Sequence, residues 1–140
     1  MVVKEIKTKK DIKKFKKFRE NLYKNDLFYV STVEFNVDMI LKRETQFARS
    51  CVTKPIAVEC EGRIVAECVL VFNPKDDFVQ IAFFESLDNQ SEAVSLIKEK
   101  AKDFAKQSGV KKITVGLNGH LSYGVGLTDG ISKPNTFDST

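Results

Sequence analysis

The sequence predicts an α/β domain (α+β in looser schemes), built on a mixed and mainly antiparallel sheet flanked by helices. Three observations predict it. Short apolar runs of strand length follow one another between residues 54 and 86, separated by turn residues. Amphipathic helical patterns lie on both sides of these runs, and one more apolar run follows the last helix. The chain of 140 residues, with 42% apolar and 30% charged residues, has the length and composition of one globular domain.

The N-terminal third is expected to hold one strand and two helices. Residues 2–7 alternate weakly between apolar and polar side chains, which favours a short strand. A helix then opens at Thr8 or Lys9, because apolar residues recur at steps of three and four. Its inward stripe comprises Ile12, Phe15, Phe18 or Arg19, and Leu22. Residues 33–48 are predicted to form a second helix. Its inward set is Phe35, Met39 and Ile40.

Three consecutive strands are predicted next. Residues 54–60 and 63–72 flank Glu61–Gly62, a pair that suits a two-residue hairpin turn with positive backbone angles. The run NPKDD at 73–77 is a second turn, and residues 78–86 form the third strand. The third strand has apolar side chains on both faces, which indicates an interior position in the sheet.

The most regular helical pattern covers residues 91–109. Ser91 is expected to cap this helix and Gly109 to end it. Its inward stripe is Ala93, Leu96, Ile97, Ala101 and Phe104. Residues 110–117 form a last strand, which should lie parallel to strand 78–86 because a helix connects the two. We therefore expect a core domain at residues 1–118 and a glycine-containing loop or tail at 119–140.

Composition excludes several classes of protein. No apolar stretch is long enough to span a bilayer, and the N-terminus has no apolar signal region, so we expect a cytoplasmic protein without membrane contact. Cys51, Cys60 and Cys68 are expected to be small apolar side chains rather than disulfide partners. A single histidine and no CxxC pair leave no metal site, and we expect none.

Positive charge is concentrated at the N-terminus. Residues 1–24 hold ten Lys or Arg and three acidic residues, a net charge of +7, whereas the rest of the chain carries −3. Such a segment can attract an anionic partner such as nucleic acid, CoA or a lipid headgroup, or it can be the solvated face of a helix. The strands lack the basic and aromatic pattern of RNA-binding sheets, so specific nucleic-acid binding is not expected.

The order of elements and three motifs resemble the GNAT acetyltransferase superfamily. The motifs are KKFKKFRENLYKNDLFYV at 13–30, FFESLDN at 83–89 and GLNGHLSYGVGLTDG at 116–130. They look like those of the N-terminal domain of a bacterial GNAT-like family. The resemblance implies an acyl-CoA-dependent N-acetyltransferase that transfers an acetyl group from acetyl-CoA to a small amine.

The resemblance also implies where acetyl-CoA would bind. In such proteins the pantetheine arm enters where the central and fifth strands part, and the pyrophosphate lies at the N-terminus of the next helix. Phe84 and Asn118 would then lie beside the arm, and Asn89 and Ser91 near the pyrophosphate. The corresponding segment here is ESLDNQSEA at 85–93, which has no glycine and three carboxylates, so this loop is either structural or a degenerate pyrophosphate site.

Two residues are candidates for catalysis. Glu85 lies at the end of the central strand, where the superfamily often has a carboxylate that acts as general base on the amine; a solvated strand-end glutamate is the alternative. Tyr123 is a candidate proton donor. His120, in the glycine-containing loop, is a general base or simply a loop histidine. One histidine and no nucleophile elbow argue against a hydrolase.

Two further expectations concern the C-terminal part. Only 22 residues follow Asn118, so the last helix and strands of the superfamily are missing or atypical. The fifth strand would then be an open edge, which a homodimer could cover. The alternative to an enzyme is a non-catalytic GNAT-like module that serves in assembly or ligand sensing.

Overall fold

The structure, a computed structural model, describes residues 1–27 and 32–119 and contains one five-stranded sheet in the order β1-β2-β3-β4-β5. The strands are β1 (Val2–Glu5), β2 (Val52–Cys60), β3 (Arg63–Phe72), β4 (Phe78–Ser86) and β5 (Lys112–Val115). The helices are α1 (Lys9–Tyr23), α2 (Thr32–Leu41), α3 (Gln46–Ser50) and α4 (Ser91–Gln107). Strands β1 to β4 are antiparallel, and β5 lies parallel to β4. This is the predicted mixed, mainly antiparallel sheet.

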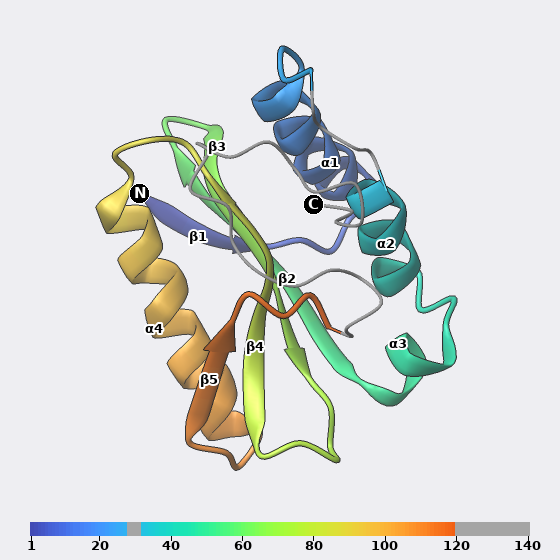
Figure 1. The fold of residues 1–140 in the computed structure, drawn as a ribbon. Helices are drawn as coiled ribbons and strands as arrows, with labels where there is room; N and C mark the ends of the chain where they lie inside the picture. Colours follow the sequence, from blue (N-terminus) through green and yellow to red (C-terminus); the bar gives the residue numbers. More distant parts are fainter. Residues whose placement is uncertain (28–31, 120–140) are drawn as a thin grey trace.

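Helices cover both faces of the sheet (Figure 1). Helix α4 lies on one face, and α1 and α2 lie on the other. Each face has its own apolar core. The α4 side is built around Leu70, Ile81 and Ile97, and the α1 side around Phe15, Ile40 and Phe83. Because β3 and β4 bury side chains on both faces, they form the interior of the fold.

The hairpin and the parallel strand form as predicted. Glu61 and Gly62 have φ values of 50° and 77°, the left-handed geometry of a tight hairpin turn. Gly109, with φ of 74°, follows the end of α4. The predicted cap at Ser91 is wrong: the residue before the helix is Gln90, and its side chain makes no capping hydrogen bond. Ser91 is instead the first helical residue, and its carbonyl accepts a hydrogen bond from Ser95.

The single helix predicted at 33–48 is also wrong, because the structure divides this stretch into α2 and α3. Arg43 takes a left-handed φ of 56°, which ends the helical turn before it. Thr45 then starts α3, since its hydroxyl accepts a hydrogen bond from the Ala48 N–H at 3.0 Å. Ile40 is buried and Met39 half-buried, as expected. The side chain of Phe35 lies outside the described residues.

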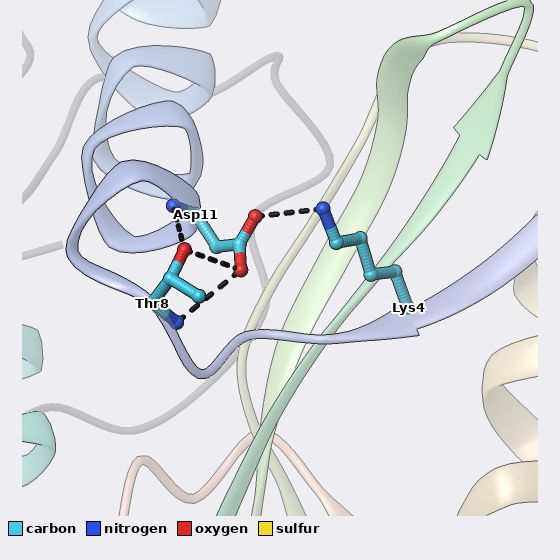
Figure 2. A network of polar contacts seen from close by, with 3 residues as sticks. All are labelled: Lys4, Thr8 and Asp11. Atoms are coloured by element: carbon cyan, nitrogen blue, oxygen red, sulfur yellow. Dashed lines mark hydrogen bonds and ion pairs between the residues drawn. The ribbon is translucent and has the colours of Figure 1, made fainter.

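A polar network joins β1 to the start of α1 (Figure 2). Thr8 and Asp11 form a capping box: the Asp11 N–H donates to the Thr8 hydroxyl at 3.1 Å, and the Thr8 N–H donates to Asp11 Oδ2 at 3.2 Å. Lys4 Nζ lies 2.7 Å from Asp11 Oδ1. These hydrogen bonds lower the pKa of Asp11 well below its usual range. The bond from Lys4 has the largest effect, and those from Thr8 come next.

The inward stripe of α1 differs from the expected one. Asp11, Phe15 and Arg19 are buried at steps of four, whereas Ile12, Phe18 and Leu22 are half-buried. Of the two alternatives for this part of the stripe, Phe18 and Arg19, the arginine is therefore the one that faces the sheet. Among the described strands, β5 is one edge of the sheet, as expected, and β1 is the other. Residues 120–140, most of the predicted tail, lie outside the described residues.

Candidate functional site

The site begins at a bulge in β4. Glu67 pairs with Glu85 and Val69 with Ala82, so three steps along β4 correspond to two along β3. The extra residue bends the strand, and Phe83 takes a φ of 51°. A left-handed backbone on a bulky residue costs of order 1–3 kcal/mol, so the surrounding structure must hold it. The bulge brings Phe83 and Glu85 to the α1 face.

Side chains from two other segments satisfy the backbone of this bulge. Arg19 Nη2 donates to the Phe83 carbonyl at 2.6 Å, and the Phe83 N–H donates to Asn118 Oδ1 at 2.8 Å. Next to Asn118, Gly119 exchanges two hydrogen bonds with the buried side chain of Gln80, at 2.8 and 3.3 Å. Helix α1 and the segment after β5 therefore both hold β4 at this point.

Four side chains form a cluster above the bulge, which we call the Arg19 cluster: Arg19, Tyr23, Glu67 and Glu85. Arg19 Nη1 lies 2.9 Å from Glu85 Oε1, and the Tyr23 hydroxyl donates to Glu85 Oε2 at 2.5 Å. Arg19 Nε lies 3.9 Å from Glu67 Oε1. The arginine is 4% exposed, which places its charge in a low-dielectric interior where its contacts are strong.

The two carboxyl groups differ in their surroundings. Glu67 has no exposed surface, and neither of its side-chain oxygens has a hydrogen-bond partner among the described residues. Burial raises the pKa of Glu67 to about 9, the Arg19 charge opposes this, and the Glu85 charge adds to it. Burial also raises the pKa of Glu85, while Arg19 and the Tyr23 hydrogen bond work against the rise.

Strands β4 and β5 part just before the bulge. Their pairing ends at Ile81 and Val115, although β4 continues to Ser86. Beyond Val115, the Asn118 side chain accepts a hydrogen bond from the Phe83 N–H, and the Gly119 backbone bonds the Gln80 side chain. Among the described residues, no strand pairs with this edge of β4 at the level of Glu85.

The N-terminus of α4 carries negative charge. Asp88 and Glu92 flank its first turn, and Asn89 takes a left-handed φ of 59° in the turn before it. Asn89 and Ser91 are both exposed. Their placement leaves them accessible to a ligand, but the two carboxylates oppose the helix dipole's attraction for an anion.

An open groove of about 560 Å³ lies between α1 and the start of β3. Its apolar wall includes Phe18, Leu22, Ile64 and Leu87, and its charged wall includes Lys14, Lys17 and Arg63. None of the described residues that line it is acidic. Its lining includes Leu22 and Leu87, which are close in sequence to Tyr23 and Glu85, but no member of the Arg19 cluster.

The structure brings together only some of the residues singled out in the sequence. Glu85 and Asn118 lie on either side of Phe83, whereas Phe84 points to the opposite face and packs against the core under α4. His120 and Tyr123 lie outside the described residues. The role of each remains a prediction.

Sequence reasoning missed Arg19, Tyr23 and Glu67 as site residues. Two signals were present. Arg19 stands four residues after Phe15 in the inward stripe of a helix, and Glu67 interrupts the apolar run of β3. A charged residue in a buried position is rare unless it is paired, so two such residues on packed elements indicate a partnership.

The described residues contain neither a metal-binding group of side chains nor a membrane-spanning helix. Within 1–27 and 32–119, no group of three His, Cys, Asp or Glu side chains is arranged to hold a metal ion. Over the same ranges, none of the helices combines the length and the apolar character needed to cross a bilayer.

Comparison with known proteins shows the fold. No protein-family model and no curated protein sequence matches the chain. Two solved structures are similar over nearly their whole length. One is a predicted acetyltransferase with acetyl-CoA from Clostridium acetobutylicum, 13% identical with a TM-score of 0.57, covering 96% of this chain and 95% of that one. The other is AAC(6')-Iy in complex with the bisubstrate analogue CoA-S-monomethyl-acetylneamine, 10% identical with a TM-score of 0.54, covering 96% of each chain. The protein thus has a GNAT-like acetyltransferase fold.

Proposed function

We propose that the protein is an acetyl-CoA-dependent N-acetyltransferase that acts on a small amine, with Glu85 as the general base. The observation that carries the proposal is the position of Glu85, just past the point where β4 and β5 part, held by Arg19 and Tyr23. The similar solved structures, which hold acetyl-CoA or a CoA analogue, support this choice of donor. A pKa raised by burial makes Glu85 a stronger base than an exposed carboxylate.

In this proposal each residue has a separate role. Acetyl-CoA supplies the activated acyl group. Glu85 takes the proton that the amine loses when its nitrogen attacks, and Tyr123 returns a proton to the departing thiolate. Phe84 and Asn118 border the arm of the donor, and Asn89 and Ser91 lie beside its phosphates. The Phe83 N–H at the same edge donates to Asn118.

We further propose that the acceptor amine carries an anionic group. The groove between α1 and the start of β3 has three cationic side chains and, among the described residues, no acidic one, and its volume lies in the usual range of small-ligand sites. Two amines test this, one ending in a carboxylate and the other in a second amino group. The first, 5-aminopentanoate, should be acetylated in preference to the second, cadaverine, and Lys17→Glu should reduce that preference. Lys98→Glu, on the exposed side of α4, is the control. Preference for cadaverine would contradict the proposal.

The test of the catalytic role compares two carboxylates. Thiol release from acetyl-CoA in the presence of an amine should fall by roughly 10²- to 10⁴-fold in Glu85→Gln. Glu99→Gln, an exposed carboxylate on α4 away from its first turn, should retain the wild-type rate. Equal rates for wild type and Glu85→Gln would exclude Glu85 as the base. Tyr123→Phe tests the proton donor in the same assay.

A second candidate function is a non-catalytic GNAT-like module for assembly or ligand sensing. The observation that favours it is the acidic N-terminus of α4, where Asp88 and Glu92 disfavour a pyrophosphate. We propose for this case that a second copy pairs along β5, where Ile113 and Val115 are 39% and 47% exposed. Size-exclusion chromatography with light scattering should then give a dimer, which Val115→Lys should weaken.

A further inference from the structure

Two carboxyl groups of the Arg19 cluster lie at paired positions on neighbouring strands. Glu67 of β3 and Glu85 of β4 are directly paired residues. Like charges at such positions repel one another, and more strongly in a buried site than in water. Among the described residues, the ionisable groups near Glu67 are Arg19 from α1, Glu85 from β4 with its partner Tyr23, and the neighbour Cys68, which is buried on the opposite face.

The guanidinium of Arg19 is not shared equally between the two carboxyl groups. It lies 2.9 Å from Glu85 and uses another nitrogen to bond the Phe83 carbonyl, but it approaches Glu67 only to 3.9 Å. The Tyr23 hydroxyl also donates to Glu85. From β2, the residue paired with Glu67 is Ala57, which offers no charge. The two shortest contacts to a carboxyl group in the cluster, from Arg19 and from Tyr23, therefore both go to Glu85.

An ionised Glu67 would be a second negative charge in the interior, with no hydrogen bond to either oxygen from the described residues. Removing an ion from water without such compensation costs far more than burying the neutral acid. We infer that Glu67 holds a proton in the folded protein at neutral pH, so that the cluster carries one carboxylate, on Glu85, and Arg19 serves that carboxylate alone.

Glu67 is thus a positioning residue for Glu85. If it lost its proton, a second anion would compete for Arg19 and weaken the hold on Glu85. That Glu85 acts as a base rests on the proposed function. The charge of Glu67 does not, so the two ideas can fail separately.

The experiment compares the unfolding of wild type and Glu67→Gln by urea between pH 5 and pH 10. Glutamine has the shape of the protonated acid. Between the ordinary pKa of 4.5 and the folded pKa of about 9, the unfolded chain releases a proton that the folded chain keeps. The unfolding equilibrium constant of wild type relative to Glu67→Gln should therefore rise by up to about tenfold per pH unit in that window. Glu20→Gln, exposed on the outer face of α1, is the matched control, and its ratio to wild type should stay flat.

A ratio for Glu67→Gln that stays constant with pH would overturn the inference. A second measurement applies even if that variant does not fold: infrared spectra of wild type at pH 7 should show the C=O stretch of a protonated carboxylic acid. This band should vanish as the pH is raised past about 9. Its absence at pH 7 would also overturn the inference.

The positioning role has its own readout. The kcat/KM of wild type relative to Glu67→Gln should be constant up to about pH 8 and change only as Glu67 ionises. If the kcat/KM ratio of the two proteins changed in the acidic part of the pH profile, Glu67 would be charged at neutral pH, which contradicts the proposal. If neither protein transfers an acetyl group, the proposed function fails while the unfolding and infrared results still decide the charge of Glu67.

Discussion

Helix α1 takes part in two networks of acidic and basic side chains. The pKa of the buried carboxyl group is shifted in opposite directions in the two networks. At its N-terminus, both oxygens of Asp11 accept hydrogen bonds from Lys4 and Thr8, and the pKa of Asp11 falls (Figure 2). Further along, Glu67 faces α1 with no hydrogen bond to either oxygen, and its pKa rises. Both side chains are under 10% exposed.

The comparison shows that burial alone does not set the charge of a carboxyl group. Burial raises the pKa of both acids, and hydrogen bonds reverse this only for Asp11, which Lys4 and Thr8 contact, whereas Glu67 has one cation at 3.9 Å. The first network caps a helix and keeps its acid ionised. The second stores strain at the bulge and at Glu67, which is the kind of arrangement found at functional sites.

The largest effect is expected from removing the shared cation. Arg19→Met should destabilise the protein by about 3–5 kcal/mol, because Glu85 and the Phe83 carbonyl would lose their buried partner. Lys13→Met, on the exposed side of the same helix, should change stability by less than about 0.5 kcal/mol. Urea unfolding at pH 7 measures both. Equal effects would show that the Arg19 cluster is not the sensitive network of α1.

Tyr23→Phe removes one hydrogen bond from the same cluster. Loss of the donor to the Glu85 carboxylate should cost about 1.5–3 kcal/mol of stability. It should also raise the pKa of Glu85 further, because the hydroxyl currently lowers it. A titration of the Glu85 carboxyl carbon by NMR would detect the change, and an unchanged pKa would contradict the assigned bond.

At the other network, Thr8→Ala should cost about 1 kcal/mol, the usual effect of losing an N-cap. The matched change Thr53→Ala, in β2, removes a hydroxyl of the same type away from any helix start and should cost less. Urea unfolding of both variants decides. A smaller loss for Thr8→Ala than for Thr53→Ala would argue against the capping box.

The smallest effect concerns acid. Because the folded pKa of Asp11 is lowered, its contribution is present above the ordinary value of 3.8 and is lost as the pH falls below it. Asp11→Asn should therefore flatten the acid side of the stability curve, modestly, because Lys4 is 41% exposed. The opposite sign is expected for Glu67→Gln, which removes the loss of stability between the ordinary pKa of 4.5 and the folded pKa of about 9. If both variants changed the pH dependence of stability in the same direction, the contrast between the two networks would be contradicted.

The sheet could be predicted from the sequence because its turns are chemically explicit. The strands at 63–72 and 78–86 were predicted to the residue, since Glu61–Gly62 and the NPKDD run mark their ends. The break between α2 and α3 could not be predicted in this way. It depends on a left-handed Arg43, and arginine gives no sequence signal for that geometry.

The site was harder to predict because it depends on tertiary contacts. Glu85 was identified from a resemblance, but the bulge that turns it toward α1 arises from one extra residue, with Phe83 in a conformation that its residue type disfavours. Arg19 was only an alternative to Phe18 in an amphipathic pattern. Hydrophobic periodicity cannot show that an arginine faces inward when its partners come from strands about 50 and 65 residues away.

The measurement that tests the central claim most directly is a thermal unfolding scan with and without acetyl-CoA. A ligand at about 100 times its dissociation constant should stabilise the folded state by roughly 2.7 kcal/mol, which for a chain of this size raises Tm by several degrees. We expect such a shift in wild type and in Glu85→Gln, because that carboxylate is proposed to act on the amine. No shift at millimolar acetyl-CoA would contradict the acetyltransferase proposal and favour the non-catalytic module.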